Sequence, residues 1–182
     1  MSAQTQTLTR FDASQGPRSL GPDDGKLVDL GSIGARMMAW TEETGGGFSL
    51  VEHPMPPRAL AAPLHRHARE DEYSFVLEGR VGAQLGDEFV YGEPGDLIFK
   101  PRNQWHTFWN AGDEPARLLE IISPAGFENY FEEFIDHSEP LTPPKIAAIA
   151  ARYGLELDFD SLPRLLEQHG LQFAAAAPAG AR

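Results

Sequence analysis

Residues 65–79, HRHAREDEYSFVLEG, and residues 95–110, GDLIFKPRNQWHTFWN, contain three runs of strand-forming residues that carry three histidines and the glutamate Glu72. The first two histidines stand two positions apart, so on an extended strand both imidazoles project from the same face. The glutamate opens the second run, and the third histidine follows a turn-rich segment. Three imidazoles and one carboxylate suit a divalent transition metal. The sequence therefore predicts one metal site with four ligands, which are His65, His67, Glu72 and His106.

Neighbouring acids and further histidines leave alternatives open. A shorter spacer after the second histidine would select Asp71 in place of Glu72, and Glu70 is a further competitor. Three single histidines are interpreted as surface or hydrogen-bonded core residues, because that is the usual role of a lone histidine. They are His53, His137 and His169, and His53, beside a cluster of prolines, is also a candidate cavity residue.

The spacing of these residues resembles the first of two sequence motifs of the cupin superfamily. That motif runs glycine, five residues, His-x-His, three or four residues, glutamate, six residues and glycine. The matching positions here are His65, His67, Glu72 and Gly79, while Ala59 occupies the place of the leading glycine. The six residues between Glu72 and Gly79 favour Glu72 over its acidic neighbours. The departure at Ala59 concerns a turn and no ligand.

The second segment resembles the second cupin motif, in which glycine, proline, glycine, histidine and asparagine follow at fixed spacings. The matching positions are Gly95, Pro101, His106 and Asn110. Asn103 replaces the central glycine of this motif. Asparagine tolerates the left-handed backbone conformation better than most other residues, so we expect the turn to form.

Many short runs of strand-forming residues separated by turns predict an all-β protein and argue against alternating βαβ units. Gly86 and Asp87, for example, form a compact hairpin connection. The resemblance implies the cupin-type double-stranded β-helix, a jelly-roll barrel. No internal repeat is visible, so we expect one barrel.

The apolar pattern changes to helical spacing after the barrel, which predicts C-terminal helices in 127–136, 142–154 and 162–169. Gly154 and Gly170 are the expected stops of the last two helices. We therefore expect four parts along the chain: a flexible N-terminal arm in 1–26, the cupin barrel in 27–125, a helical C-terminal extension in 126–172 and a flexible tail in 173–182.

Side-chain alternation indicates which residues share the face of the ligands. On the strand of the glutamate these are Ser74, Val76 and Glu78. On the strand of the third histidine Phe108 and Asn110 point inward, and the residues that point outward are Trp105, Thr107 and Trp109. Outward aromatic side chains need cover from the N-terminal strands or from another subunit. We therefore expect a homodimer.

Composition excludes several classes of partner. The chain has 182 residues and a formal net charge of −12, which argues against nucleic acid and anionic membranes because both select basic surfaces. It contains no cysteine, so thiolate ligands and disulfides are absent. No apolar run is long enough to span a bilayer, and the N-terminal residues lack the pattern of a signal peptide. We expect a cytoplasmic protein.

The three-histidine, one-glutamate pattern resembles the quercetin dioxygenase-like branch of the cupins, whose members cleave an electron-rich hydroxyl substrate with dioxygen. The resemblance implies a dioxygenase-type oxidoreductase that acts on a small phenolic, flavonol-like or enolisable substrate. It implies one divalent transition metal ion per chain, and Fe, Ni, Co, Mn, Cu and Zn all suit the ligands. Glu72 is the expected catalytic residue, because its carboxylate can accept a proton from a bound enol or hydroxyl.

Two other functions stay open, namely a non-catalytic cupin that binds a small molecule or a metal and a cupin isomerase or lyase. The sequence has no helix-turn-helix pattern, which argues against a regulator that reads DNA. Four arginines near the motifs are candidates to hold an anionic substrate, although a solvated surface position also fits them. They are Arg58, Arg66, Arg69 and Arg102.

Overall fold

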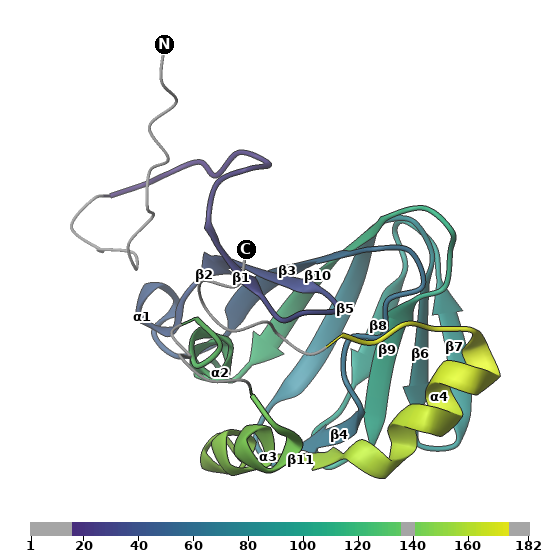
Figure 1. Cartoon of the computed structure of the whole chain (residues 1–182). Helices are drawn as coiled ribbons and strands as arrows, with labels where there is room; N and C mark the ends of the chain where they lie inside the picture. Colours follow the sequence, from purple (N-terminus) through teal and green to yellow (C-terminus); the bar gives the residue numbers. More distant parts are fainter. Residues whose placement is uncertain (1–15, 136–140, 175–182) are drawn as a thin grey trace.

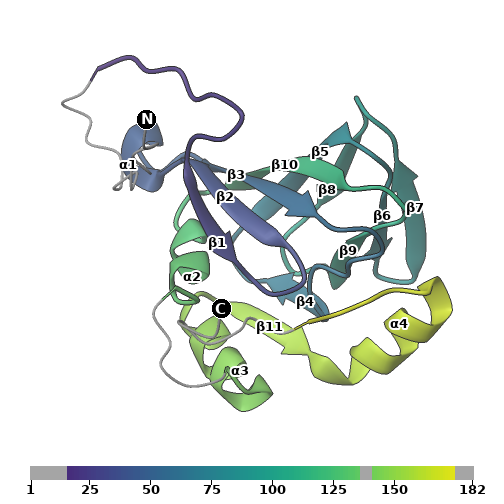
Figure 2. The same cartoon turned by 45° about the horizontal axis from the view of Figure 1, so that its top comes forward.

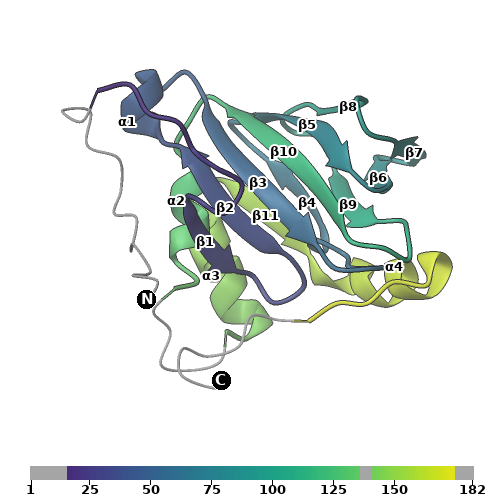
Figure 3. The same cartoon turned by 90° about the horizontal axis from the view of Figure 1, so that it is seen from above.

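The computed structural model describes residues 16–135 and 141–174, in which two antiparallel β-sheets face each other (Figure 1, Figure 3). The first sheet has the strand order β1-β2-β3-β10-β5-β8, and the second has the order β11-β4-β9-β6-β7. Strands that are distant in the chain are neighbours in both sheets, as in a jelly roll. The expected all-β barrel with C-terminal helices is therefore confirmed.

The strands of the first sheet are β1 (Lys26–Asp29), β2 (Gly34–Ala39), β3 (Ser49–Met55), β10 (Ala116–Ser123), β5 (Asp71–Glu78) and β8 (Leu97–Lys100). Those of the second sheet are β11 (Leu155–Asp158), β4 (Leu64–His67), β9 (His106–Asn110), β6 (Val81–Leu85) and β7 (Glu88–Gly92). The expected hairpin at Gly86 joins β6 to β7. Within the described ranges, no helix is long and apolar enough to cross a membrane.

The helices are α1 (Thr41–Thr44), α2 (Glu128–Glu132), α3 (Pro143–Arg152), α4 (Leu162–His169) and the short 3-10 helix η2 (Phe159–Ser161). The last of the three expected helices has the bounds of α4, and Gly170 ends it with a left-handed φ of 62°. The first is shorter than expected, because the N–H of Glu133 turns back to the carbonyl of Tyr130. His137, the first part of the expected arm and most of the expected tail lie outside the described residues.

Alternation along β5 and β10 builds the interior between the sheets. On β5 the side chains of Glu72, Ser74 and Val76 are buried, as predicted, whereas Glu78 at the strand end is exposed. On β10 every second side chain is buried. Val76 packs with Leu118 in an apolar cluster. The half of β5 that precedes this cluster therefore presents polar side chains to the interior, and the predicted ligand Glu72 is one of them.

The outward face of β9 corrects one expectation. Thr107 and Trp109 are buried by their own chain, and neither the N-terminal strands nor a second subunit provides the cover. Helix α4 packs there through Leu165, which lies in one apolar cluster with Trp109. Figure 2 shows α4 beside the sheet that contains β9. The indole also lies over Gly82, where a Cβ atom would stand 2.4 Å from the ring. The aromatic residues of β9 therefore give no support to the expected homodimer, which stays a prediction.

The segment between α3 and α4 contains a strand that the sequence did not predict. Strand β11 pairs with β4, so that Leu155 lies opposite His67 and Leu157 lies opposite His65. Helix α3 packs beside it, as Figure 1 shows. The alternating apolar pattern of β11 consists of Leu155 and Leu157 alone, and a pattern of two residues is too short to predict a strand. The C-terminal extension therefore completes the sheet directly beside the strand that carries two of the predicted ligands.

Candidate metal centre

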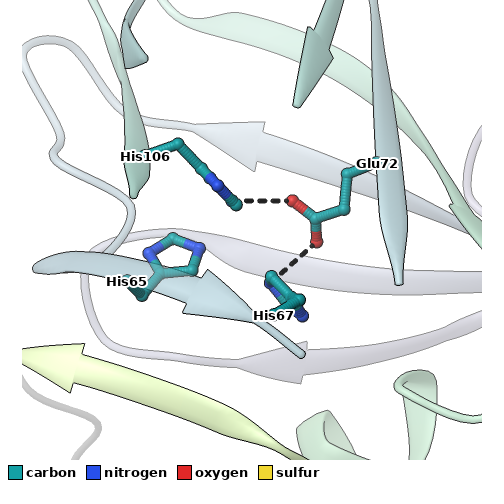
Figure 4. Close-up of side chains that lie close together, drawn as sticks. All are labelled: His65, His67, Glu72 and His106. Atoms are coloured by element: carbon teal, nitrogen blue, oxygen red, sulfur yellow. Dashed lines mark hydrogen bonds and ion pairs between the residues drawn. The ribbon is translucent and has the colours of Figure 1, made fainter. Parts of the chain in front are cut away.

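The four predicted ligands meet in one buried cluster between the sheets (Figure 4). His65 and His67 come from β4, Glu72 from β5 and His106 from β9. Each offers one ligand atom, and these atoms all lie within 4.8 Å of one another. The register of the strands explains the meeting, because His65 is paired with His106 across the β4–β9 ladder. The cluster could therefore hold a metal ion.

Backbone carbonyls orient two of the imidazoles. The Nδ1–H of His65 donates to the carbonyl of Pro63 at 2.9 Å, and that of His106 donates to the carbonyl of Gln104 at 2.9 Å. A carbonyl only accepts, so in both rings Nε2 carries the lone pair and faces the cluster. Burial lowers the pKa of His65 and of His106, which keeps both rings neutral. Neutral imidazole is the form that binds a metal.

His67 is the strongest sign that the cluster fits a metal. Its ring is 1% exposed, and neither of its nitrogens has a hydrogen-bond partner among the described residues. Nε2 lies 3.3 Å from a carboxylate oxygen of Glu72, and Nδ1 lies 3.5 Å from a carboxylate oxygen of Glu70. A buried nitrogen without a partner costs folding free energy, of the order of 1–3 kcal/mol. Coordination through Nε2 would remove that cost.

The turn before His106 is fixed to the strand of the other histidines. Asn103 adopts a left-handed φ of 64°, as its replacement of a motif glycine requires. Its backbone N–H donates to the carbonyl of His67 at 2.7 Å. The turn thus ties the start of β9 to the end of β4, which holds the three imidazoles in register.

The carboxylate of Glu72 contacts three basic groups. The Nζ of Lys100 lies 2.9 Å and the Nε2 of His106 lies 3.2 Å from Oε2, while His67 approaches Oε1. Burial alone would raise the pKa of Glu72, but the charge of Lys100 and the neighbouring imidazoles hold it well below its usual value. The residue is therefore an anion in the folded protein, which is the form that binds a metal.

Lys100 and Glu120 belong to the site, although we did not select them from the sequence. The Nζ of Lys100 lies 2.8 Å from Glu120, whose carboxylate also accepts a hydrogen bond from the hydroxyl of Ser74 at 2.9 Å. Burial raises the pKa of Glu120 to about 7, and for Lys100 the two carboxylates outweigh burial and raise its pKa. A charged residue inside a short apolar strand was the only available signal.

The three consecutive acids have three different positions. Asp71 is directed outward and pairs with Arg102 at 2.7 Å. Glu70 is buried beside the Nδ1 side of His67, away from the other ligand atoms. Only Glu72 reaches the cluster, so the structure places the acid that the motif spacing favours beside the three histidines.

A cavity of about 110 Å³ adjoins the cluster and is lined by three of the four ligands. Its other walls are mostly apolar and include aromatic rings from β9, from α2 and the residue before it, and from η2, namely Phe108, Phe127, Tyr130, Phe131 and Phe159. His53 also lines it. None of the four arginines near the motifs does; Arg58 and Arg66, for example, form ion pairs with Asp113 and Glu156. His169 packs against Trp109 with ring centroids 4.5 Å apart, outside the cavity.

Comparisons with known proteins agree with this fold. Residues 52–122 match the Cupin domain family. The chain is 35% identical over 60 residues to the tetracenomycin polyketide synthase protein TcmJ of Streptomyces glaucescens, a match that covers 33% of this chain and 40% of that protein. The matched part thus spans well under half of that relative.

Two solved structures show the same fold. The polyketide cyclase RemF from Streptomyces resistomycificus is 26% identical and superposes with a TM-score of 0.51 over 59% of this chain and 79% of that chain. KdgF from Halomonas sp. is 18% identical, with a TM-score of 0.54 over 62% of this chain and 98% of that chain. The double-stranded β-helix is therefore confirmed, and the cluster lies within the segment that matches the family.

Proposed function

Because a cupin domain here surrounds a buried cluster of three histidines and one glutamate, we propose that the protein is a metal-dependent enzyme acting on an uncharged, enolisable or phenolic aromatic substrate. One observation carries the proposal, which is that the cluster forms the polar end of an otherwise apolar and aromatic cavity. Such a cavity with a few convergent polar groups is typical of a small-molecule site.

The lining of the cavity supports the choice of substrate. Apart from the metal cluster, the ionisable side chains among its lining residues are His53 and Tyr130, and no lysine or arginine is among them. An anionic substrate would enter such a cavity without a counter-charge, which is costly. Aromatic walls favour a flat aromatic molecule, because ring pairs stabilise beyond their buried area.

The metal would be held through Nε2 of His65, His67 and His106 and through the carboxylate of Glu72. When bound, it would supply a Lewis acid that lowers the pKa of a substrate enol or phenol. Lys100 keeps the Glu72 carboxylate ionised and oriented. The aromatic side chains exclude water from the cavity and align the ring of the substrate.

The comparisons favour chemistry without an oxidant. TcmJ is named a polyketide synthase protein and RemF a polyketide cyclase. Closing a ring on a polyketide requires removal of a proton next to a carbonyl group, and an enolisable substrate fits that requirement. Cyclisation or isomerisation of a polyketide-like substrate is therefore our first candidate. Cleavage of a flavonol with dioxygen is the second, favoured by the three-histidine, one-glutamate set.

The test begins with elemental analysis of the purified wild type and of Glu72→Gln and His106→Ala. About one transition metal per chain is expected in the wild type and much less in both variants. Glu156→Gln is the matched control, because Glu156 is an exposed carboxylate on β11 that pairs with Arg66. A wild type that takes up no metal after reloading would overturn the proposal.

Substrate trials with the metal-loaded protein then separate the two candidates. An aromatic β-polyketone and a flavonol are incubated with and without dioxygen, and oxygen uptake and product mass are recorded. Conversion of the polyketone without oxygen uptake supports the first candidate, whereas oxygen uptake with the flavonol supports the second. Binding of either compound without turnover would point to a non-catalytic cupin.

A further inference from the structure

We propose that His53 is a catalytic base in the cavity, a role that rests on the proposed function. In the step it performs, an O–H bond or a C–H bond next to a carbonyl of the substrate breaks. The proton moves to Nε2 of His53, and the electron pair stays on the substrate as an enolate or phenolate. No oxidant or further reactant is required for this transfer.

The surroundings of His53 fix which nitrogen is available. The residue lies on β3 and is 3% exposed, and its Nδ1–H donates to the carbonyl of Gly34 at 2.8 Å. Because that carbonyl only accepts, Nε2 carries the lone pair. No residue in the described part of the chain forms a hydrogen bond with Nε2, and the ring lines the cavity. His53 therefore presents an unused proton acceptor beside the place of the substrate.

Aromatic neighbours hold the ring in this orientation. Phe108 lies against His53 with ring centroids 5.6 Å apart and an interplanar angle of 51°. Phe131 lies edge-on at 5.6 Å with an angle of 74°. Both rings line the same cavity. A ring that packs against two aromatic side chains and is hydrogen-bonded through Nδ1 needs no reorganisation before it accepts a proton at Nε2.

The other ionisable residues of the cavity are less suited to accept the proton. Both oxygens of Glu72 already contact basic groups, and the same carboxylate would bind the metal. Burial raises the pKa of Tyr130, so its phenol stays protonated. The remaining ionisable lining residues, His65 and His67, belong to the metal cluster. His53 is thus the free base of the cavity, although Glu72 is the residue to which the sequence assigned this role.

Electrostatics agree with the geometry. Burial is the main cause that lowers the pKa of His53 to about 4, and the charge of Lys100 acts in the same direction. The hydrogen bond to Gly34 and the charges of Glu72 and Glu52 oppose this shift but do not outweigh it. The ring is therefore neutral at pH 7 and able to accept a proton. A base this weak removes only a proton that is already acidified, which links its action to the Lewis acid at the neighbouring cluster.

The test compares two substitutions in the metal-loaded, full-length protein. In His53→Asn the side-chain amide can still donate to the Gly34 carbonyl, but no basic nitrogen remains. His53→Leu removes both functions. His169→Asn is the matched control, because His169 lies outside the cavity at the end of α4. We expect His53→Asn to keep the metal content and melting temperature of the wild type and to lose about 100-fold or more in turnover.

A readout independent of turnover is the protonation of His53 when a flavonol binds. In nitrogen-15 spectra of histidine-labelled protein, the Nε2 signal of His53 is assigned as the one that is missing from His53→Asn. When the flavonol binds to the wild type, this signal should move from the position of a nitrogen with a lone pair to that of a protonated nitrogen. The absorbance of the bound flavonol should shift to that of its anion in the wild type and not in His53→Asn.

Three results would overturn the role of His53. These are turnover of His53→Asn within about twofold of the wild type, an Nε2 signal that does not move on binding, and flavonol ionisation that is the same in both proteins. Activity in His53→Asn together with its loss in His53→Leu would assign His53 a structural hydrogen bond only. A wild type that takes up no metal and binds no flavonol would overturn the proposed function as well. Elemental analysis distinguishes this result from the three results that concern His53 alone, because in those the protein still contains the metal.

Discussion

Lys100 and Glu72 form an ion pair that is shielded from solvent, with Nζ 2.9 Å from Oε2 and the lysine side chain fully buried. The same ammonium group lies 2.8 Å from Glu120. One cation therefore serves two buried carboxylates. Because burial raises the pKa of Glu120 to about 7, the metal-free site gains an excess of negative charge as the pH rises through that value. A divalent cation beside Glu72 would reverse the sign of this excess. The stability of the barrel and its affinity for metal are therefore coupled.

Replacing this cation tests the coupling. Lys100→Met leaves Glu72 and Glu120 buried without their partner, and we expect the metal-free protein to lose about 3–5 kcal/mol of unfolding free energy. The loss should be smaller in the metal-loaded protein, because the metal supplies positive charge next to Glu72. Urea denaturation with and without metal measures both values. The double variant Lys100→Met, Glu120→Gln is the control and should recover part of the loss. Equal losses in the two states would contradict the coupling.

The pKa of His53 predicts a specific acid sensitivity. In the unfolded chain a histidine titrates near its ordinary value of about 6.5, and in the fold the pKa falls to about 4. Between these values the unfolded state binds one proton more, so stability is complete above about pH 6.5 and declines as the pH falls to about 4. The contribution is about 3 kcal/mol. Chemical denaturation across this range should show the unfolding free energy of the wild type falling by that amount relative to His53→Asn, so that the variant, equal in stability at pH 7, becomes the more stable protein near pH 4. An unfolding free energy difference that stays constant with pH would contradict the shift.

The acid behind His67 predicts a graded effect on metal binding. Glu70 lies beside Nδ1 of His67, as a carboxylate that orients and polarises a metal-bound histidine would. We expect Glu70→Gln to weaken metal affinity by about 10-fold to 100-fold without abolishing it. Asp71→Asn is the neighbouring control, because Asp71 pairs with Arg102 at the surface. Competition with a chromogenic chelator measures the metal affinity of each variant. Equal metal affinities of Glu70→Gln and Asp71→Asn would contradict the role of Glu70.

The spacing of the ligands in the sequence was enough to predict the cluster. The two-residue separation of His65 and His67 on one strand and the length of the turn before His106 are local features, which a sequence pattern can reveal. Asn103 shows this, since its left-handed φ follows from its place in the motif. The contributions of Lys100 and β11 depend on strand pairing over long sequence distances, which periodicity does not reveal. Trp109 was correctly placed on the outer face, but the sequence did not indicate that α4 would cover it.

The homodimer predicted from the sequence has a different candidate surface, which is the outer face of β5 and β8. Phe75 is paired with Leu97 across these strands, and Tyr73 with Phe99. Leu97 is 56% exposed, and β8 is the last strand of its sheet. An exposed apolar edge of this kind favours pairing with the same edge of a second copy.

Light scattering at micromolar concentration tests this surface. We expect a dimer for the wild type and a monomer for Leu97→Lys, because a lysine on an edge strand opposes pairing. Leu27→Lys is the matched control, since Leu27 is 62% exposed on β1 at the opposite edge of the same sheet. This control should stay dimeric. A monomeric wild type would exclude the homodimer, and a dimer that survives Leu97→Lys but not Leu27→Lys would move the interface to β1.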